Sequence, residues 1–430
     1  MTSSPFTGIR VADLSMMWAG PFATKLLGEQ GAEVLKIESP TAWDNIRTLI
    51  PQPGKADPWN SSYYFNTYNR AKKSVTLDLA QAQGRQVFLE LLAHCDVLVE
   101  NYRADVLDRL DLGYDVLQAA NPRLIIVSMA GFGKTGPDRG LVGFGPVIEQ
   151  MSGLAALTGY EGEDVPYKCG VSYGDPVAGV AAAGAVVLGL LQRRRTGVGM
   201  VVDLAQREVA ATLAGSAFVS AARDPHVVHH GNRHPQSAVA PRGCYRCADE
   251  ARLYRNAEYS LLPARAVDEQ WIAVSVLDDT MWSALAALLG QPAWAVLSLA
   301  DRVARHDELD EAIAAWCAPL DAAEAVATLR DHAIAASRVL DTVAIHDDPH
   351  LRSRGFWIQL QHPRMDPDWR QPGPSWRFMN ADTRLERPAP LFGEHTRPVP
   401  RQLLGYDDAR LDELHASNVI GNEPINPGVG

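Results

Sequence analysis

The first 130 residues alternate short apolar runs with amphipathic segments, and this alternation constrains the fold more than any other feature. The predicted strands cover 9–14, 32–38, 74–79, 96–102 and 123–131, and two of the intervening helices cover 21–31 and 83–95. Strands joined by crossover helices imply a parallel, doubly wound α/β sheet with right-handed connections. Ligands of such a sheet bind beyond the carboxyl ends of its strands.

Beyond this region the pattern indicates a second, smaller domain. Residues 226–243 are rich in His, Pro and Gly and predict a long loop of the kind that often carries function. A strand at 271–276 and amphipathic helices to about residue 330 predict the smaller domain. The remaining predicted elements are antiparallel strands at 356–363 and 375–380 and a terminal helix at 407–420.

Composition argues against several classes of protein. Forty basic residues against 51 acidic ones give a net charge of −11, which disfavours nucleic acid as a partner. The start lacks the pattern of a secretory signal, and five cysteines do not form a disulfide framework, so we expect a cytoplasmic protein. The longest apolar stretch, 176–191, falls short of the roughly 20 residues that span a bilayer. We therefore expect a buried, closely packed helix and no membrane partner.

No metal site is predicted. Cys244 and Cys247 form a lone C-x-x-C without a second pair of ligands, and the histidines show no H-E-x-x-H pairing. We also expect no tightly bound cofactor, because the turn after the first strand, "SMMWAGP", lacks the G-x-G-x-x-G pattern of dinucleotide binding. A helix begins in this turn, and a helix N-terminus favours a phosphate-bearing ligand.

The stretch "GVSYGDPVAG", 170–179, places Asp175 between a glycine and a proline at the start of the long apolar run. Asp followed by Pro is typical of a helix start, where the carboxylate caps free N–H groups. The same position suits a nucleophile, because the helix N-terminus favours the ionised carboxylate that attack requires. The residues alone leave both interpretations open.

Two polar clusters adjoin predicted strands. Arg70, Lys72 and Lys73 precede the strand at 74–79, where they form either a solvated turn or an anion site. The stretch "ENYRADVLDRL" follows the strand at 96–102, where an α/β fold presents groups to its ligand. Its candidate ligand-binding residues are Asn101, Tyr102, Arg103 and Arg109.

Nine sequence blocks in the right order resemble the class III CoA-transferases, the CaiB/BaiF type that includes formyl-CoA, carnitine and bile-acid CoA-transferases. They run through essentially the whole chain. Among them are "GIRVADLSMMWAGPFATKLLGEQGAEVLKIE", "YFNTYNRAKKSVTLDL", "DVLVENYRADVLDRLDLGYDVL", "SMAGFGKTGPDRG", "GVSYGDPVAG", "HHGNRHP" and "RPAPLFGEHT".

The resemblance implies that Asp175 is the catalytic aspartate and that an acyl-CoA and a carboxylic acid are the substrates. The chain would move CoA from the donor to the acid through a covalent aspartyl-CoA thioester. The loop "HHGNRHP" is a candidate cover over the intermediates. The residues at CoA-contact positions are Met16, Trp18, Ser39, Leu77, Asn101, Tyr102 and Arg109, with Lys72 and Lys73 nearby.

Two departures from the family pattern concern the acyl group. Trp18 stands where the formyl-CoA type has glutamine, and Phe144 stands where the family has tyrosine. Both argue against formyl or oxalate chemistry and favour a larger or aromatic acid. Two alternatives remain, an α-methylacyl-CoA racemase, which needs a histidine that the segment 140–153 lacks, and a non-catalytic acyl-CoA-binding protein.

The family fold is an interlocked homodimer, so we expect two copies of the chain to thread through each other. The resemblance implies a Rossmann-like large domain built from 1–222 and 331–430, with a smaller α+β domain, 223–330, inserted between them. Residues 356–420 contain no self-sufficient sheet, which agrees with a C-terminal part that returns to the larger body.

Overall fold

The computed structural model describes residues 4–163, 165–224, 229–233, 238–249, 269–381, 385 and 387–425. The chain divides into two compact units. Unit 1 comprises Met1–Leu157, Pro166–His226 and Arg354–Gly430, and unit 2 comprises Thr158–Val165 and Val227–Ser353.

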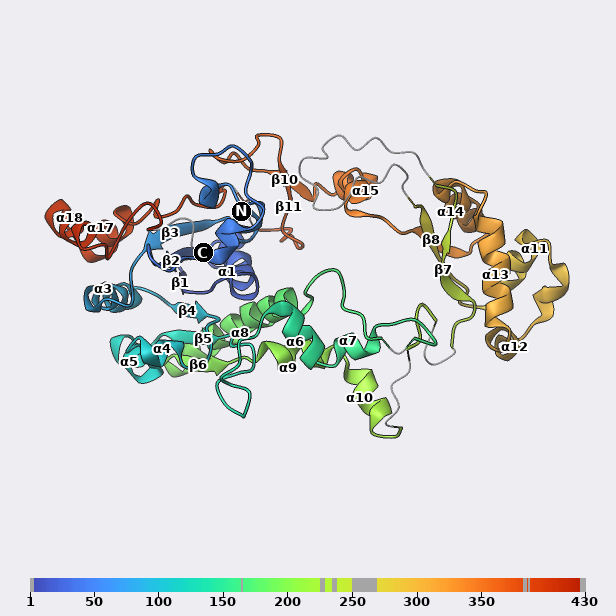
Figure 1. The fold of residues 1–430 in the computed structure, drawn as a ribbon, viewed down its shortest axis with the longest axis horizontal. Helices are drawn as coiled ribbons and strands as arrows, with labels where there is room; N and C mark the ends of the chain where they lie inside the picture. Colours follow the sequence, from blue (N-terminus) through green and yellow to red (C-terminus); the bar gives the residue numbers. More distant parts are fainter. Residues whose placement is uncertain are drawn as a thin grey trace. The chain divides into compact units, whose positions relative to one another are not determined.

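A six-stranded parallel sheet forms the centre of unit 1 (Figure 1). Its order, β3-β2-β1-β4-β5-β6, confirms the doubly wound α/β sheet expected from the alternating pattern. The chain reverses its direction of winding between β1 and β4, which makes their carboxyl ends the switch point of the sheet. The strands are β1 (Arg10–Asp13), β2 (Glu33–Glu38), β3 (Lys72–Thr76), β4 (Val97–Glu100), β5 (Ile125–Ser128) and β6 (Met200–Asp203).

Helices cover both faces of this sheet because neighbouring strand residues point to opposite sides. Val11 and Val97 pack with helices α1 (Ala19–Glu29) and α8 (Gly174–Thr196). Ala12 and Leu98, the next residues along, pack on the other face. That face is covered by α3 (Ala82–Leu92), α4 (Val106–Arg109), α5 (Tyr114–Ala120), α17 (Pro398–Leu404) and α18 (Asp408–Ala416).

Helix α8 is closely packed on one side and exposed on the other. A Cβ on Gly179 would lie 2.8 Å from the Ala19 carbonyl oxygen, so this glycine permits the close approach of α1. The prediction of a buried, closely packed helix is correct for the side that meets the sheet but wrong for the other, because one apolar stripe of α8 faces outward. Its members are Val180, Val187, Leu188 and Leu191, of which Leu188 is 68% exposed.

By length and composition, α8 could cross a membrane, with a mean hydropathy of 1.7 over its most apolar part. Among the described residues, no other single helix is long and apolar enough to do so. The pair α13 (His306–Cys317) and α14 (Ala322–Asp331), which is sharply bent, reaches this length and hydropathy only if the two helices are taken as one span. Ala178, Ala182 and Val186 of α8 pack into the core beside the sheet.

Shorter helices complete the N-terminal part of unit 1. They are α2 (Tyr63–Tyr68), α6 (Gly145–Met151), α7 (Leu154–Leu157), α9 (Gln206–Thr212) and α10 (Gly215–Ala221). Of these, α6 and α9 pack on α8 and on each other, α7 packs on α6, and α2 contacts α1. Near the C-terminus, β10 (Trp357–Gln359) and β11 (Arg370–Pro372) form a two-stranded antiparallel sheet. The strand predicted at 375–380 is absent from that described segment.

Unit 2 packs a three-stranded antiparallel sheet against helices around the fully buried Trp282. The chain returns to unit 1 at Arg354, not at 331, because β9 completes this sheet and two short helices follow it. The elements are β7 (Arg242–Arg246), β8 (Trp271–Ser275), β9 (Ala335–Arg338), α11 (Asp279–Leu288), α12 (Leu299–Ala304), α13, α14, α15 (Thr342–His346) and α16 (Pro349–Ser353).

Candidate active site

A cavity of about 520 Å³ opens at the carboxyl ends of β1, β4 and β5, at the switch point of the sheet. All of its lining residues belong to unit 1. Seven residues singled out in the sequence meet here, and the apolar remainder of the lining includes Leu141 and Val142. The seven are Met16, Trp18, Asn101, Tyr102, Arg103, Phe144 and Asp175.

Asp175 lies in the first turn of α8, where that helix packs on α6. A Cβ on Gly145 of α6 would overlap with Oδ2 of Asp175, and a Cβ on Gly174 would lie 3.1 Å from Ile148. The glycine on each helix therefore brings the two helix starts into contact. No side chain caps α8 by a hydrogen bond, and its N-cap residue is Tyr173, so the predicted capping role of Asp175 is not observed.

The electrostatic environment of Asp175 corrects the expectation from the helix-start pattern. That pattern predicts a carboxylate stabilised in its ionised form. Instead, burial raises the pKa of Asp175 to about 6, the nearby Glu149 carboxylate adds to the rise, and Lys168 offsets part of it. Asp175 is thus ionised at neutral pH, as a nucleophile must be, but it holds its charge at a free-energy cost.

The turn after β1 lines the cavity and is held from two sides. Asn101 binds both backbone groups of Met16, since its Oδ1 accepts from the Met16 N–H at 2.7 Å and its Nδ2 donates to the Met16 carbonyl at 2.8 Å. The N–H of Met17 donates to Asp44 Oδ1 at 2.9 Å. Met17 has a φ of +66°, a conformation that an L-residue rarely adopts without such support.

Beneath this turn lies a network of buried ion pairs. Lys36 pairs with Asp44 at 2.8 Å and also donates to the Ser15 carbonyl, while Lys72 pairs with Asp13 at 2.9 Å. All four charged side chains of these two pairs are fully buried. Lys72 therefore supports the turn from below, and the prediction that it contacts CoA is not supported.

Four other predicted CoA contacts also lie away from the cavity. Lys73 pairs with Glu33 in a separate polar depression, and the Leu77 side chain is buried in the core. Ser39 hydrogen-bonds with Thr41. Arg109 lies outside the cavity as well, because its guanidinium is mostly exposed and pairs with Asp105 at 3.1 Å.

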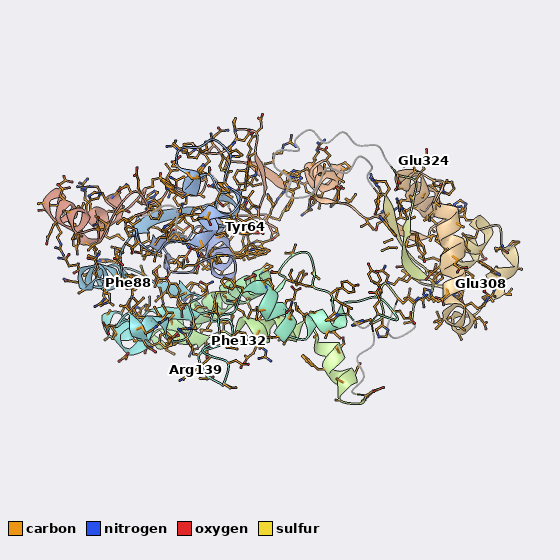
Figure 2. All side chains as sticks on the ribbon, in the orientation of Figure 1. Tyr64, Phe88, Phe132, Arg139, Glu308 and Glu324 are labelled. Carbon is orange, nitrogen blue, oxygen red and sulfur yellow. The ribbon has the colours of Figure 1, made fainter. Side chains whose placement is uncertain are left out.

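Aromatic rings form one wall of the site. Trp18 packs against Tyr64, with ring centroids 6.3 Å apart, and against Tyr68, at 5.3 Å. Figure 2 labels Tyr64, which comes from α2. Burial, Tyr64 and the charge of Asp175 raise the pKa of Tyr68, so the Tyr68 hydroxyl stays neutral.

A second cavity of about 470 Å³ shares Arg103 with the first. It also contains Lys134 and Arg139, the latter labelled in Figure 2. Arg103 is held by both oxygens of Asp105, at 2.7 and 2.9 Å. Four charged residues near the two cavities carry no recognisable signal in the sequence, since each is an isolated charge within an irregular or short segment: Lys134, Arg139, Glu149 and Lys168.

Two further expectations concern unit 2 and metals. Of the loop 226–243, residues 226–228 and 234–237 lie outside the described residues, so its covering role stays a prediction. Within the part of the chain that the structure describes, no three His, Cys, Asp or Glu side chains gather into a metal site.

Comparison with known proteins gives one consistent family. Residues 6–261 and 252–396 match the model of CoA-transferase family III. The chain is 31% identical over 424 residues to succinyl-CoA–D-citramalate CoA-transferase of Chloroflexus aurantiacus, with 97% of this chain and 98% of that protein covered. It is 29% identical over 430 residues to succinyl-CoA:glutarate CoA-transferase of Mus musculus, covering 97% and 90%.

A solved structure agrees with this result. The CAIB/BAIF family protein from Brucella suis superimposes with a TM-score of 0.79 at 27% identity, covering 94% of this chain and all of that one.

Proposed function

Because this chain belongs to CoA-transferase family III, we propose that it moves CoA from an acyl-CoA to a carboxylic acid through a covalent intermediate on Asp175. The observation that carries this proposal is the position of Asp175. Its carboxylate is mostly buried, lines an apolar cavity at the switch point of the sheet, and is ionised at neutral pH at a free-energy cost. Such a carboxylate is a better nucleophile than one in water.

Each step exchanges one acyl bond for another. An Asp175 oxygen attacks the thioester carbonyl of the donor. The C–S bond breaks, CoA leaves as its thiolate, and a mixed anhydride between Asp175 and the acyl group remains. The thiolate then attacks the aspartyl carbonyl carbon and releases the donor acid as a carboxylate, which leaves an aspartyl-CoA thioester. The acceptor carboxylate repeats these two steps in reverse and departs as its CoA thioester.

CoA would extend across the two adjoining cavities. The turn Met16–Trp18 lines the first and would follow the pantetheine arm towards Asp175. Lys134 and Arg139 in the second cavity are cations suited to the CoA phosphates, and Arg103 stands where the two cavities meet. Although Lys134 pairs with Glu100 at 3.2 Å and Arg103 pairs with Asp105, both line these cavities, whereas Lys72, Lys73 and Arg109 line neither.

The acyl group that fits the first cavity is larger and less polar than formate or oxalate. Trp18 and Phe144 both line this cavity, and Phe144 is 57% exposed towards solvent in the single chain. The relatives named above act on succinyl, citramalate or glutarate groups, which carry a second carboxylate. Among the described lining residues the one cation is Arg103, which Asp105 already binds. This lining favours an apolar or aromatic monocarboxylic acid.

The working form of the enzyme would be a homodimer. The outward stripe of α8 is continuous and apolar, and α10 has no buried residue although it carries Phe218 and Val219, which are more than half exposed. An exposed apolar surface of this extent is typical of an interface between subunits. Analytical ultracentrifugation would give twice the chain mass of 46.8 kDa.

A panel of carboxylic acids tested with acetyl-, succinyl- and aryl-CoA, read by mass spectrometry, would test the transfer. We expect CoA exchange with apolar or aromatic acids, a hydroxylamine-sensitive adduct on the peptide that contains Asp175, and neither in Asp175→Ala. The racemase alternative predicts α-deuterium incorporation from deuterated water without an acceptor acid. A folded Asp175→Ala enzyme with unchanged transfer would exclude the aspartyl mechanism.

A further inference from the structure

Glu149 is a buried carboxylate beside Asp175 that the transfer steps do not use. It lies four residues after Gly145 on α6 and so projects from the same helix face as the residue that touches Asp175. Only 2% of Glu149 is exposed, and its Oε2 accepts no hydrogen bond within the described residues. Its single described ionic partner is Lys168, whose Nζ lies 3.7 Å from that oxygen.

Lys168 comes from the segment that leads into α8, so three charged groups meet where α6, this segment and α8 converge. With Asp175 ionised, two carboxylates share one ammonium in a mostly buried space. With Asp175 acylated, its charge is gone, and Glu149 and Lys168 form a balanced pair. In a low-dielectric site, two carboxylates with one ammonium are destabilised by their net negative charge, whereas the balanced pair of Glu149 and Lys168 is not.

We propose that Glu149 and Lys168 are positioning residues with opposite effects on Asp175: the Glu149 charge favours the uncharged, covalent form over the free carboxylate, and the Lys168 charge limits that preference. This inference rests on the proposed function, because it presupposes that Asp175 becomes acylated. Glu149 repels the free anion and thereby drives acylation. Lys168 limits that repulsion, so that Asp175 still ionises at neutral pH.

The other described groups around Asp175 are either neutral or paired with an opposite charge, so the role falls to Glu149 and Lys168. On α2, Tyr68 is neutral because its pKa is raised. On α9, Gln206 lines the cavity without a charge and donates to the Met129 carbonyl at 2.7 Å. After β4, Arg103 is neutralised by Asp105. On α1, the Lys25 ammonium faces Phe22 and Tyr68 and pairs with Glu29.

The test compares two variants whose effects have opposite signs. In the wild type, the rate of the first half-reaction should fall below about pH 6, as Asp175 becomes protonated. Glu149→Gln removes the repulsion and should move this acid limb to lower pH by about one unit. Lys168→Gln removes the compensating charge and should move it to higher pH by a similar amount.

The trapped adduct supplies a second readout. At a fixed ratio of acyl-CoA to its free acid, Glu149→Gln should lower the ratio of covalent to free enzyme several-fold, and Lys168→Gln should raise it. Glu208→Gln on α9 is the matched control, because Glu208 is exposed and should change neither quantity. Lys168→Arg keeps the charge and should retain the wild-type pH profile.

The outcomes separate the two proposals. If the wild type forms an Asp175 adduct but the two variants shift the acid limb in the same direction or not at all, the role of the pair is refuted while the transferase function stands. If the wild type forms no adduct, the transferase function itself fails. Should Glu149→Gln not fold, Lys168→Gln decides the question, since the Lys168 side chain is 28% exposed and tolerates an amide.

Discussion

Replacing Asp175 by asparagine should stabilise the protein, and the gain should depend on pH. The pKa of Asp175 is raised from 3.8 to about 6 in the folded chain, so the folded state disfavours the ionised carboxylate. Below pH 3.8 both states bind the proton and the penalty is absent. As the pH rises from 3.8 to 6, the unfolded chain loses the proton first, and the free energy of unfolding falls.

The structure sets the size of this effect. A rise of the pKa from 3.8 to about 6 corresponds to about 3 kcal/mol, because each unit is worth about 1.4 kcal/mol. An asparagine side chain has nearly the same shape but does not ionise. The difference in unfolding free energy between Asp175→Asn and the wild type should therefore grow by roughly 2 to 3 kcal/mol between pH 4 and pH 8.

Urea unfolding from pH 4 to 8, followed by circular dichroism, measures this difference. Asp368→Asn is the matched control, because Asp368 is exposed in the same unit and its replacement should leave the curve unchanged. A difference between Asp175→Asn and the wild type that stays constant with pH would refute the reasoning. It would mean that the folded protein does not disfavour the ionised form of the Asp175 carboxyl group.

Three further substitutions test separate parts of the structure. Lys72→Met leaves the buried Asp13 carboxylate unpaired and should cost about 3 to 5 kcal/mol, seen as a lower unfolding midpoint. Gly145→Ala should reduce transfer at least about a hundredfold in a folded protein, because its Cβ would overlap with Asp175 Oδ2 and misplace the nucleophile. Leu188→Glu on the outward stripe of α8 should convert the dimer into monomers in sedimentation.

Each of these has a control in the same chain. Lys73→Met should cost less than about 1 kcal/mol, because its ion pair is partly exposed. Gly215→Ala should leave transfer unchanged, since Gly215 lines neither cavity and a Cβ there meets no atom within 4 Å. Val296→Glu, at a highly exposed position in unit 2, should leave the assembly intact. If the Lys72→Met protein is as stable as the wild type but binds CoA poorly, Lys72 contacts CoA and its assignment to the buried network is wrong.

Most of the sheet was predictable from the sequence because its buried strands are short apolar runs between helices. Val11 and Ala12, for example, are adjacent and both buried, on opposite faces, so the strand is marked by a continuous apolar run. The position of the cavity follows from the same pattern, since ligands of a doubly wound sheet bind at the carboxyl ends of its strands. The resemblance added Met16 and Trp18 and implied the catalytic role of Asp175, whereas Asn101 was already indicated by its position after a predicted strand.

Charged residues were harder to interpret. Lys72 and Lys73 are neighbours in the sequence, yet one is fully buried and the other partly exposed. The difference comes from Asp13, which lies 59 residues away and is visible only once β1 and β3 are placed. The role of Glu149 also depends on tertiary contacts that the sequence does not reveal, because its effect on Asp175 requires α6 to pack against α8.

The C-terminal cover of the sheet has a consequence for synthesis. Leu411, Leu414 and Ile420 pack in the same core as Leu98 and Ile126 of the central strands. A ribosome making about 5 to 20 residues per second needs roughly 15 to 60 s to extend the chain from β5 to Ile420. During that time the part of this apolar face that α17 and α18 cover has no packing partner. Folding in the cell should therefore depend on chaperones that shield this face until translation ends.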